Sequence, residues 1–246
     1  MKVTRRKIQL IKRNFDPTSD RYLEDEIVID IMNGDVNSEG ICMLSEFSGL
    51  YHAQRTSIRE SAAYEEGSTP SNFPRTDERA VDIRLATKAK TSERWEQIET
   101  ILWSIIRMDR DCILRVWTED KYRELKVRLS RTPKDTMKYD PEYYCHMIWA
   151  IQFVASDPWW YGELITSEWK NSNASGNGKV YVANPADQPC FIEWASGQIY
   201  GTEIWSIPDA INIKAPTPVK MITMPPVKPG DEFLVETHPL RMPMES

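Results

Sequence analysis

Histidine, cysteine and paired carboxylates are the residues of this chain whose chemistry suits catalysis or metal binding. The three histidines, His52, His146 and His238, fall in different segments, and His146 directly follows Cys145. Adjacent residues of a strand point to opposite faces, so Cys145 and His146 would not pair as nucleophile and base. The spacing of the four cysteines matches no zinc or redox motif, and no HExxH, GxSxG or phosphate-binding glycine loop is present. We therefore expect no catalytic residues, no metal site and no cofactor.

Carboxylates are plentiful but grouped beside predicted turns, as Glu24-Asp25-Glu26, Glu65-Glu66 and Glu119-Asp120. Two carboxylates at the right separation would serve glycoside hydrolysis, but a separation across a fold is not readable from sequence. The Asp and Asn alternation of a calcium-binding loop is missing. Solvated charge clusters are the favoured interpretation, and a degraded hydrolase is a distant alternative.

Basic residues open the chain, before any acidic one: Lys2, Arg5, Arg6, Lys7, Lys12 and Arg13. One interpretation is that they contact nucleic acid or an acidic partner. The other is that they form the solvated edge of a strand, where Lys and Arg disfavour pairing with another strand. The net charge of −6 argues against general or sequence-specific nucleic-acid binding, which needs a basic surface. The longest stretch without Asp, Glu, Lys or Arg, residues 143–156, is shorter than the roughly 20 residues that span a membrane. No apolar signal core follows the basic start, so we expect the protein to be made and kept on the cytoplasmic side.

One amphipathic helix is predicted over Ser92–Met108. Its apolar residues recur at helical spacing and would face a core, while Thr91 or Ser92 would cap its start. These apolar residues are Trp95, Ile98, Ile101, Leu102, Ile105 and Ile106.

Strands with alternating apolar and polar residues surround this helix. The clearest are residues 81–85, with Val81, Ile83 and Leu85, and the hairpin Cys112–Leu129, which turns at Glu119-Asp120. Residues 144–154 are apolar on both faces, as for a strand covered on both sides. Earlier candidates are 7–11, 26–31 and 41–44. The first part of the chain is thus a mainly β, α+β domain with one embedded helix.

The polar segment Glu65–Arg79, EEGSTPSNFPRTDER, is predicted to connect elements without being one. It is either an interaction loop, for which Ser68, Asn72, Phe73 and Arg75 are the candidates, or a mobile surface loop.

The chain changes character near Asp157. Five of the nine tryptophans lie beyond it, half of the 16 prolines fall between Pro208 and Pro243, and charged residues become sparse. Domains are therefore predicted at 1–162 and 163–246. The second would be a small β-sandwich, with strands at 179–183, 190–194, 210–213, 220–222 and 232–236.

Trp159, Trp160 and Tyr161 follow Asp157-Pro158 at this boundary. Such aromatic residues act as anchors that pack a strand end onto a neighbour. Alternatively, together with Trp169, they would stack on sugar rings in a carbohydrate-binding module for host cell-wall glycans.

The order of these elements resembles the distal tail proteins of siphovirus-type bacteriophages, called minor tail proteins in phages of actinobacteria. The resemblance runs over Lys7–Gly162: the FPRTDER loop, the strand AVDIRLATK, the helix, the hairpin and the ending ASDPWWYGE. The later GKVYVANPADQPCFIEW is similar to the start of the family's second domain.

The resemblance implies an N-terminal β-sandwich belt domain with one helix and a protruding hairpin, and a galectin-like C-terminal β-sandwich. It implies a structural, non-enzymatic virion protein of the tail tip, assembled in the host cytoplasm. Six copies would form a ring adaptor, a baseplate component, around the channel for DNA and the tape measure protein. The ring would join the tail tube protein to the tail-tip hub.

Closed rings use heterologous contacts, and the charged face of the Cys112–Leu129 hairpin is predicted to form one. The candidate residues at this subunit contact are Cys112, Ile113, Arg115, Trp117, Glu124, Lys126 and Arg128.

Overall fold

The computed structural model describes residues 7–16, 21–32, 39–60, 66–70, 75–119, 121–133, 139–170, 176–183, 192–197, 201–208 and 221–236. The chain divides into two compact units, Met1–Leu164 and Ile165–Ser246. The boundary predicted after Gly162 lies beside this division. Each unit is described below by itself.

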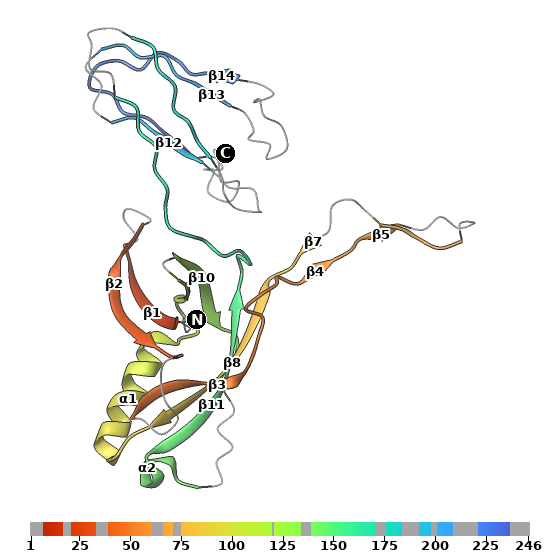
Figure 1. Cartoon of the computed structure of the whole chain (residues 1–246), viewed down its shortest axis with the longest axis vertical. Coiled ribbons are helices and arrows are strands. Elements are labelled where there is room, and N and C mark those ends of the chain that lie inside the picture. The colour runs from red at the N-terminus through yellow and green to blue at the C-terminus, as the bar shows by residue number, and fades with distance from the viewer. Residues whose placement is uncertain are drawn as a thin grey trace. The chain divides into compact units, whose positions relative to one another are not determined.

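The first unit is built on a seven-stranded antiparallel sheet in the order β2-β1-β9-β10-β11-β8-β3 (Figure 1). Its strands are β1 (Lys7–Asp16), β2 (Arg21–Asp30), β3 (Gly40–Ser48), β8 (Arg79–Lys88), β9 (Cys112–Thr118), β10 (Lys121–Leu129) and β11 (His146–Ala155). The early strands and the hairpin predicted from alternation are confirmed, and β1 and β2 extend further than expected.

This sheet bends back on itself. The strands β10 and β11 pair only through Arg128 with Val154 and Leu129 with Phe153, so the sheet turns a corner there. At the opposite side Ile31, just after β2, donates to the Ile8 carbonyl at 2.9 Å and accepts from the Met43 amide at 2.5 Å. Ile31 thereby links β1 to β3, and the sheet comes close to closing around one core.

Alternation decides which side chains fill that core. Val81, Ile83 and Leu85 are at most 1% exposed, whereas Asp82 and Arg84 between them are exposed. Full burial of such a side chain is worth about 1.5–3 kcal/mol, which makes this register strongly preferred over a one-residue slip.

Helix α1 (Ser92–Ile105) packs Leu102, Ile105 and Ile106 into the same core. The Thr91 side chain caps it by accepting from the Arg94 amide at 3.3 Å, as predicted. The helix ends before the predicted Met108, because the Arg107 carbonyl accepts from the Leu129 amide and the chain passes into the sheet. Ile101, expected on the buried face, is 38% exposed.

Strand β11 differs from its prediction in two respects. It begins at His146, because Asp140 caps a short helix, α2 (Pro141–Tyr144), and Cys145 adopts a left-handed conformation with φ 49°. Its outer face is open, with Ile148 48% exposed, while Trp149, Ile151 and Phe153 are buried. The interpretation of a strand covered on both sides was therefore wrong.

Between β3 and β8, the described residues 49–60, 66–70 and 75–78 form an antiparallel hairpin, here called the arm. In it β4 (Arg55–Thr56) pairs with β7 (Arg75–Thr76), and β5 (Arg59–Glu60) pairs with β6 (Thr69–Pro70). Figure 1 shows the arm extending from the ends of β3 and β8. The prediction that Glu65–Arg79 only connects elements was wrong, because β6 and β7 supply the returning half of this hairpin.

The second unit contains two short antiparallel pairs among its described residues. Strand β12 (Glu193–Ala195) pairs with β15 (Leu234–Glu236), and β13 (Ser206–Pro208) pairs with β14 (Met221–Thr223). Residues 179–183 carry no strand, contrary to prediction, and β13 was not predicted. The predicted strand at 210–213 lies outside the described residues. The galectin-like sandwich stays a prediction.

Candidate functional site

The β9–β10 hairpin carries the predicted subunit contact, and its two faces differ. Cys112 is 2% exposed in the core, and burial raises the pKa of its thiol to about 12. Ile113 is 5% exposed. Neither side chain is part of an open surface in this unit, because Cys112 fills the core and Ile113 is covered among its neighbours.

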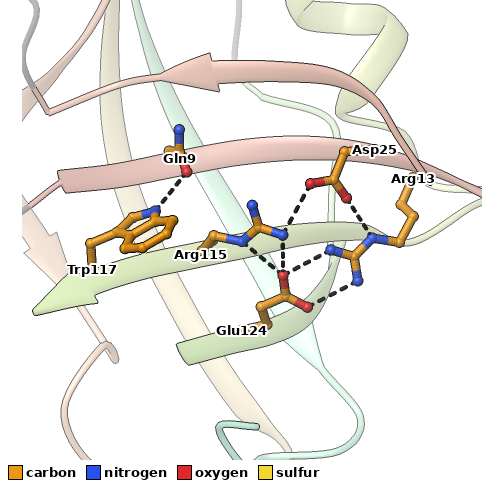
Figure 2. A network of polar contacts seen from close by, with 6 residues as sticks. All are labelled: Gln9, Arg13, Asp25, Arg115, Trp117 and Glu124. Atoms are coloured by element: carbon orange, nitrogen blue, oxygen red, sulfur yellow. Dashed lines mark hydrogen bonds and ion pairs between the residues drawn. The ribbon is translucent and has the colours of Figure 1, made fainter. Parts of the chain in front are cut away.

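The face of the hairpin that points away from the core, which also carries Ile113, holds a network of four charged side chains from four adjacent strands (Figure 2). Arg13 of β1 binds both carboxylate oxygens of Glu124 of β10, at 2.9 and 2.8 Å, and donates to Asp25 of β2 at 2.7 Å. Arg115 of β9 donates to the same two carboxylates, at 2.5 and 2.8 Å to Glu124 and 3.0 Å to Asp25. Two basic and two acidic side chains are thus joined in one cluster in which both carboxylates bind both guanidinium groups.

Burial and ion pairing shift the pKa values of Glu124 and Arg13 in this network. The four side chains are only 13% to 24% exposed. Burial alone would raise the pKa of Glu124, but the hydrogen bonds and charges of Arg13 and Arg115 outweigh it and hold that pKa below its usual value. The Glu124 hydrogen bond likewise raises the pKa of Arg13, against the opposing effect of burial. Glu124 and Arg13 thus favour their charged forms in each other's presence, and their charge-assisted bonds hold β1 and β10 in place.

Aromatic side chains extend the same face along the hairpin. The Trp117 indole donates to the Gln9 side chain at 2.7 Å (Figure 2), and its ring lies 5.1 Å from that of Tyr122. Lys7 and Arg115 sit over the Trp117 and Tyr122 rings, at 5.9 and 4.7 Å. This part of the surface combines a rigid aromatic pair with cations, a composition typical of protein contacts.

The remaining predicted contact residues also bind within the chain. Arg128 donates to Asp111 at 2.6 Å, and Lys126 lies 4.0 Å from the same carboxylate. The polar face of the hairpin is therefore organised before any partner arrives. Its place at a subunit contact stays a prediction.

The basic residues at the start of the chain that the structure describes bind acidic side chains of this chain, instead of an external partner or a solvated strand edge. Lys12 pairs with Glu26 at 2.8 Å, and Arg13 joins the network just described. Strand β1 lies between β2 and β9, so it is no sheet edge. The acidic cluster at 24–26, expected to be solvated, thus supplies partners to β1. Lys2, Arg5 and Arg6 lie outside the described residues.

The aromatic anchor Trp159-Trp160-Tyr161 rejoins the sheet after β11. Tyr161 exchanges both backbone hydrogen bonds with Glu124, at 2.7 and 2.9 Å, so the chain bulges around Pro158 and then pairs with β10. The Tyr161 hydroxyl donates to Asp157 at 2.5 Å. The Trp160 indole donates to the Leu50 carbonyl at 3.1 Å, and the Arg55 guanidinium lies 5.4 Å from the Trp159 ring. In this unit the aromatic residues pack against the start of the arm.

The alternative use of the tryptophans in sugar binding stays a prediction. The Arg55 guanidinium lies over the Trp159 ring, and Trp160 packs against the core cluster of the first unit. Trp169 belongs to the second unit, where its ring lies 6.4 Å from that of Trp205.

The predicted interaction loop lies in the arm. Ser68 is exposed, and Arg75 of β7 pairs with Asp77 at 3.0 Å while its side chain stays 74% exposed. Asn72 and Phe73 lie outside the described residues.

Two buried charged residues were not identified from the sequence. Arg79, the last residue of FPRTDER, is 3% exposed and donates to the carbonyls of Pro158, Gly49 and Leu50, at 2.8, 3.2 and 3.3 Å. Glu99 of α1 is 8% exposed and accepts from Thr87 and two indoles. An acidic residue inside the helical stripe beside tryptophans was the available signal for Glu99.

The residues that the structure describes contain no group of three or more His, Cys, Asp or Glu residues placed to hold a metal ion. None of the helices they form is long and apolar enough to cross a membrane.

The first unit is therefore a bent antiparallel β fold with one core helix, a projecting arm and a charge-paired hairpin. No family model matches the sequence, and no curated protein matches it. Among solved structures the chain is similar to a chain of the phage P2 baseplate in its activated conformation with calcium, with a TM-score of 0.50 at 15% identity over 96% of this chain and 82% of the other. That likeness shows a shared fold.

Two further structures were compared. A chain of the phage p2 baseplate with strontium has a TM-score of 0.48 at 15% identity, over 96% of this chain and 82% of that one. The Dit (gp 19.1) protein of phage SPP1, described as a paradigm of the hub adsorption apparatus in phages infecting Gram-positive bacteria, has a TM-score of 0.45 at 15% identity, over 79% and 73%.

Proposed function

We propose that the protein is a structural virion component of a bacteriophage tail tip, a distal tail protein of the siphovirus type. The supporting observation is the fold shared with a phage P2 baseplate chain, which extends over 96% of this chain. The order of loop, strand, helix, hairpin and aromatic ending found in the sequence supports the same proposal independently.

In this proposal six copies form a ring around the channel for DNA and the tape measure protein. The ring joins the tail tube protein on one side to the tail-tip hub on the other. Closure of such a ring needs two different surfaces on each copy. The hairpin face around Trp117 and Tyr122 and the exposed arm are two such surfaces, on different elements of the first unit.

A structural role also suits the way the polar residues are used. Arg13, Arg115, Glu124 and Asp25 bond one another, and Arg79 bonds main-chain carbonyls. Side chains bonded in this way hold the strands of the first unit rigidly together. A protein that joins two large assemblies needs such a rigid fold. We propose assembly in the host cytoplasm and a final location in the virion.

Immunogold electron microscopy tests the proposed location. Antibodies raised against the purified chain are applied to phage particles from a culture that expresses it, with preimmune serum as the control. We expect gold at the end of the tail distant from the capsid. Gold on the capsid, along the tail shaft, or only on cell debris would contradict the proposal.

A further inference from the structure

Arg79 lies where the arm leaves the sheet. It is the least exposed charged residue among those described, and burial lowers the pKa of its guanidinium. Its hydrogen bonds to the Gly49 and Leu50 carbonyls reach the start of the arm, and the one to the Pro158 carbonyl reaches the segment after β11. One side chain thus joins two segments that are more than 100 residues apart in the chain.

Trp160 makes the same connection from the other side. Its indole donates to the Leu50 carbonyl at 3.1 Å, and the Arg79 guanidinium lies 5.8 Å from its ring. Arg79, Trp160 and the carbonyls of Gly49, Leu50 and Pro158 are here called the clamp.

Both segments held by the clamp are tightly fitted. Gly49 has φ 79°, and a Cβ there would stand 1.9 Å from the Ala80 carbonyl oxygen, so the start of the arm lies directly on β8. The exit segment, residues 157–161, is held by the two backbone bonds between Tyr161 and Glu124. Glu124 is in turn a member of the charge network.

Separating the two segments would be costly for the clamp as a whole. Arg79 would become a buried charge with fewer acceptors, and the carbonyls would lose their donors. Partial opening is thus unfavourable, so the segments remain together or separate together.

We propose that the clamp is a conformational device that couples the position of the arm to the exit segment. A displacement of the arm by a partner loosens the Tyr161–Glu124 pairing, and a displacement of the exit segment loosens the arm. This coupling is reciprocal. It does not depend on the function proposed above.

Amide hydrogen exchange of the full chain, read by NMR, tests the coupling at two reporters. The Tyr161 amide, bonded to the Glu124 carbonyl at 2.9 Å, reports the exit segment, and the Asp77 amide, bonded to the Gln54 carbonyl at 3.1 Å, reports the arm. Gly49→Ala perturbs the start of the arm where it lies against Ala80 of β8. Gly67→Ala is its matched control, since Gly67 also has positive φ, 99°, but has nothing within 4 Å of a Cβ.

We expect Gly49→Ala to speed exchange of the Tyr161 amide by about tenfold, which corresponds to the loss of one charge-assisted hydrogen bond. Gly67→Ala is expected to leave this exchange rate unchanged. Conversely, Trp160→Phe, which keeps the ring and removes its N–H, is expected to speed exchange of the Asp77 amide. Its control is Trp95→Phe, which removes an indole bond to Thr87 away from the clamp.

Equal exchange of Tyr161 in the Gly49→Ala and Gly67→Ala variants would overturn the proposal. If Gly49→Ala fails to fold, Trp160→Phe decides alone. In that case exchange of Asp77 no faster than in Trp95→Phe would overturn it.

Discussion

Glu99 accepts hydrogen bonds from buried Thr87 and Trp149 and from partly buried Trp103, and so ties helix α1 to strands β8 and β11. One carboxylate oxygen accepts from the Thr87 hydroxyl at 2.5 Å and from the Trp149 indole at 2.9 Å. The other accepts from the Trp103 indole at 2.7 Å, and the Trp103 and Trp149 rings meet edge to face at 5.0 Å. Replacement of this carboxylate therefore tests how the helix is held.

Glu99→Gln preserves the shape of the side chain and replaces one carboxylate oxygen with an NH₂ group. The amide oxygen can occupy the position between Thr87 and Trp149, which leaves the amide N–H₂ facing the Trp103 N–H. One buried donor then loses its acceptor, at a cost of about 1–3 kcal/mol in the free energy of unfolding. Glu99→Ala removes the acceptor for all three donors, and we expect a cost of about 3–6 kcal/mol, the sum of two or more such losses.

Denaturant unfolding followed by circular dichroism measures both costs. The matched control is Glu96→Gln, an exposed residue of the same helix, for which a change within about 0.5 kcal/mol is expected. In a Trp103→Phe background the cost of Glu99→Gln should fall, because the orphaned donor is gone. A Glu99→Gln variant as stable as the Glu96→Gln control would refute the reasoning.

Three further predictions concern the charge network, the thiols and strand β11. Glu124→Gln should lower the free energy of unfolding by about 1–3 kcal/mol at neutral pH. Because the folded-state pKa of Glu124 is lowered, this difference should shrink as pH falls below its usual pKa of about 4.3 towards the folded value; a pH-independent difference in chemical denaturation would count against the network. Alkylation mapped by mass spectrometry should modify partly exposed Cys145 far faster than Cys112, which is 2% exposed with a pKa of about 12, and equal rates would place Cys112 outside the core. Ile148→Ser should change stability by less than about 0.5 kcal/mol, whereas Ile151→Ser, at 1% exposure, should cost more than about 2 kcal/mol; similar costs in thermal unfolding would restore a strand covered on both sides.

The spacing of apolar residues correctly predicted those helices and strands that bury one face in the core. The alternating residues Val81, Ile83 and Leu85 are buried as predicted, and so are Leu102 and Ile105 of the helical stripe. Such patterns arise because one face of each element packs against the core. The hairpin was equally predictable from its two alternating runs and short turn.

Contacts between distant segments were not predictable. Arg13 and Glu124 are 111 residues apart in the chain, and nothing in either neighbourhood indicates that they meet. The segment Glu65–Arg79, which contains the returning strands of the arm, was interpreted as a connection because β6 and β7 are each two residues long. A strand of two residues is too short to show an alternating pattern in the sequence. Arg79 was not singled out, since the carbonyls that hold it are backbone groups without a residue signature.

The mass of the assembled particle tests the ring proposal most directly. Six copies of the 28.6 kDa chain give 6 × 28.6 ≈ 172 kDa. Light scattering of the purified full chain, with negative-stain imaging of the same peak, should find this mass and ring-shaped particles with a central opening, and a variant of the Trp117 and Tyr122 face should lose both. A chain that remains a monomer at all concentrations, alone and with tail tubes added, would contradict the proposed ring.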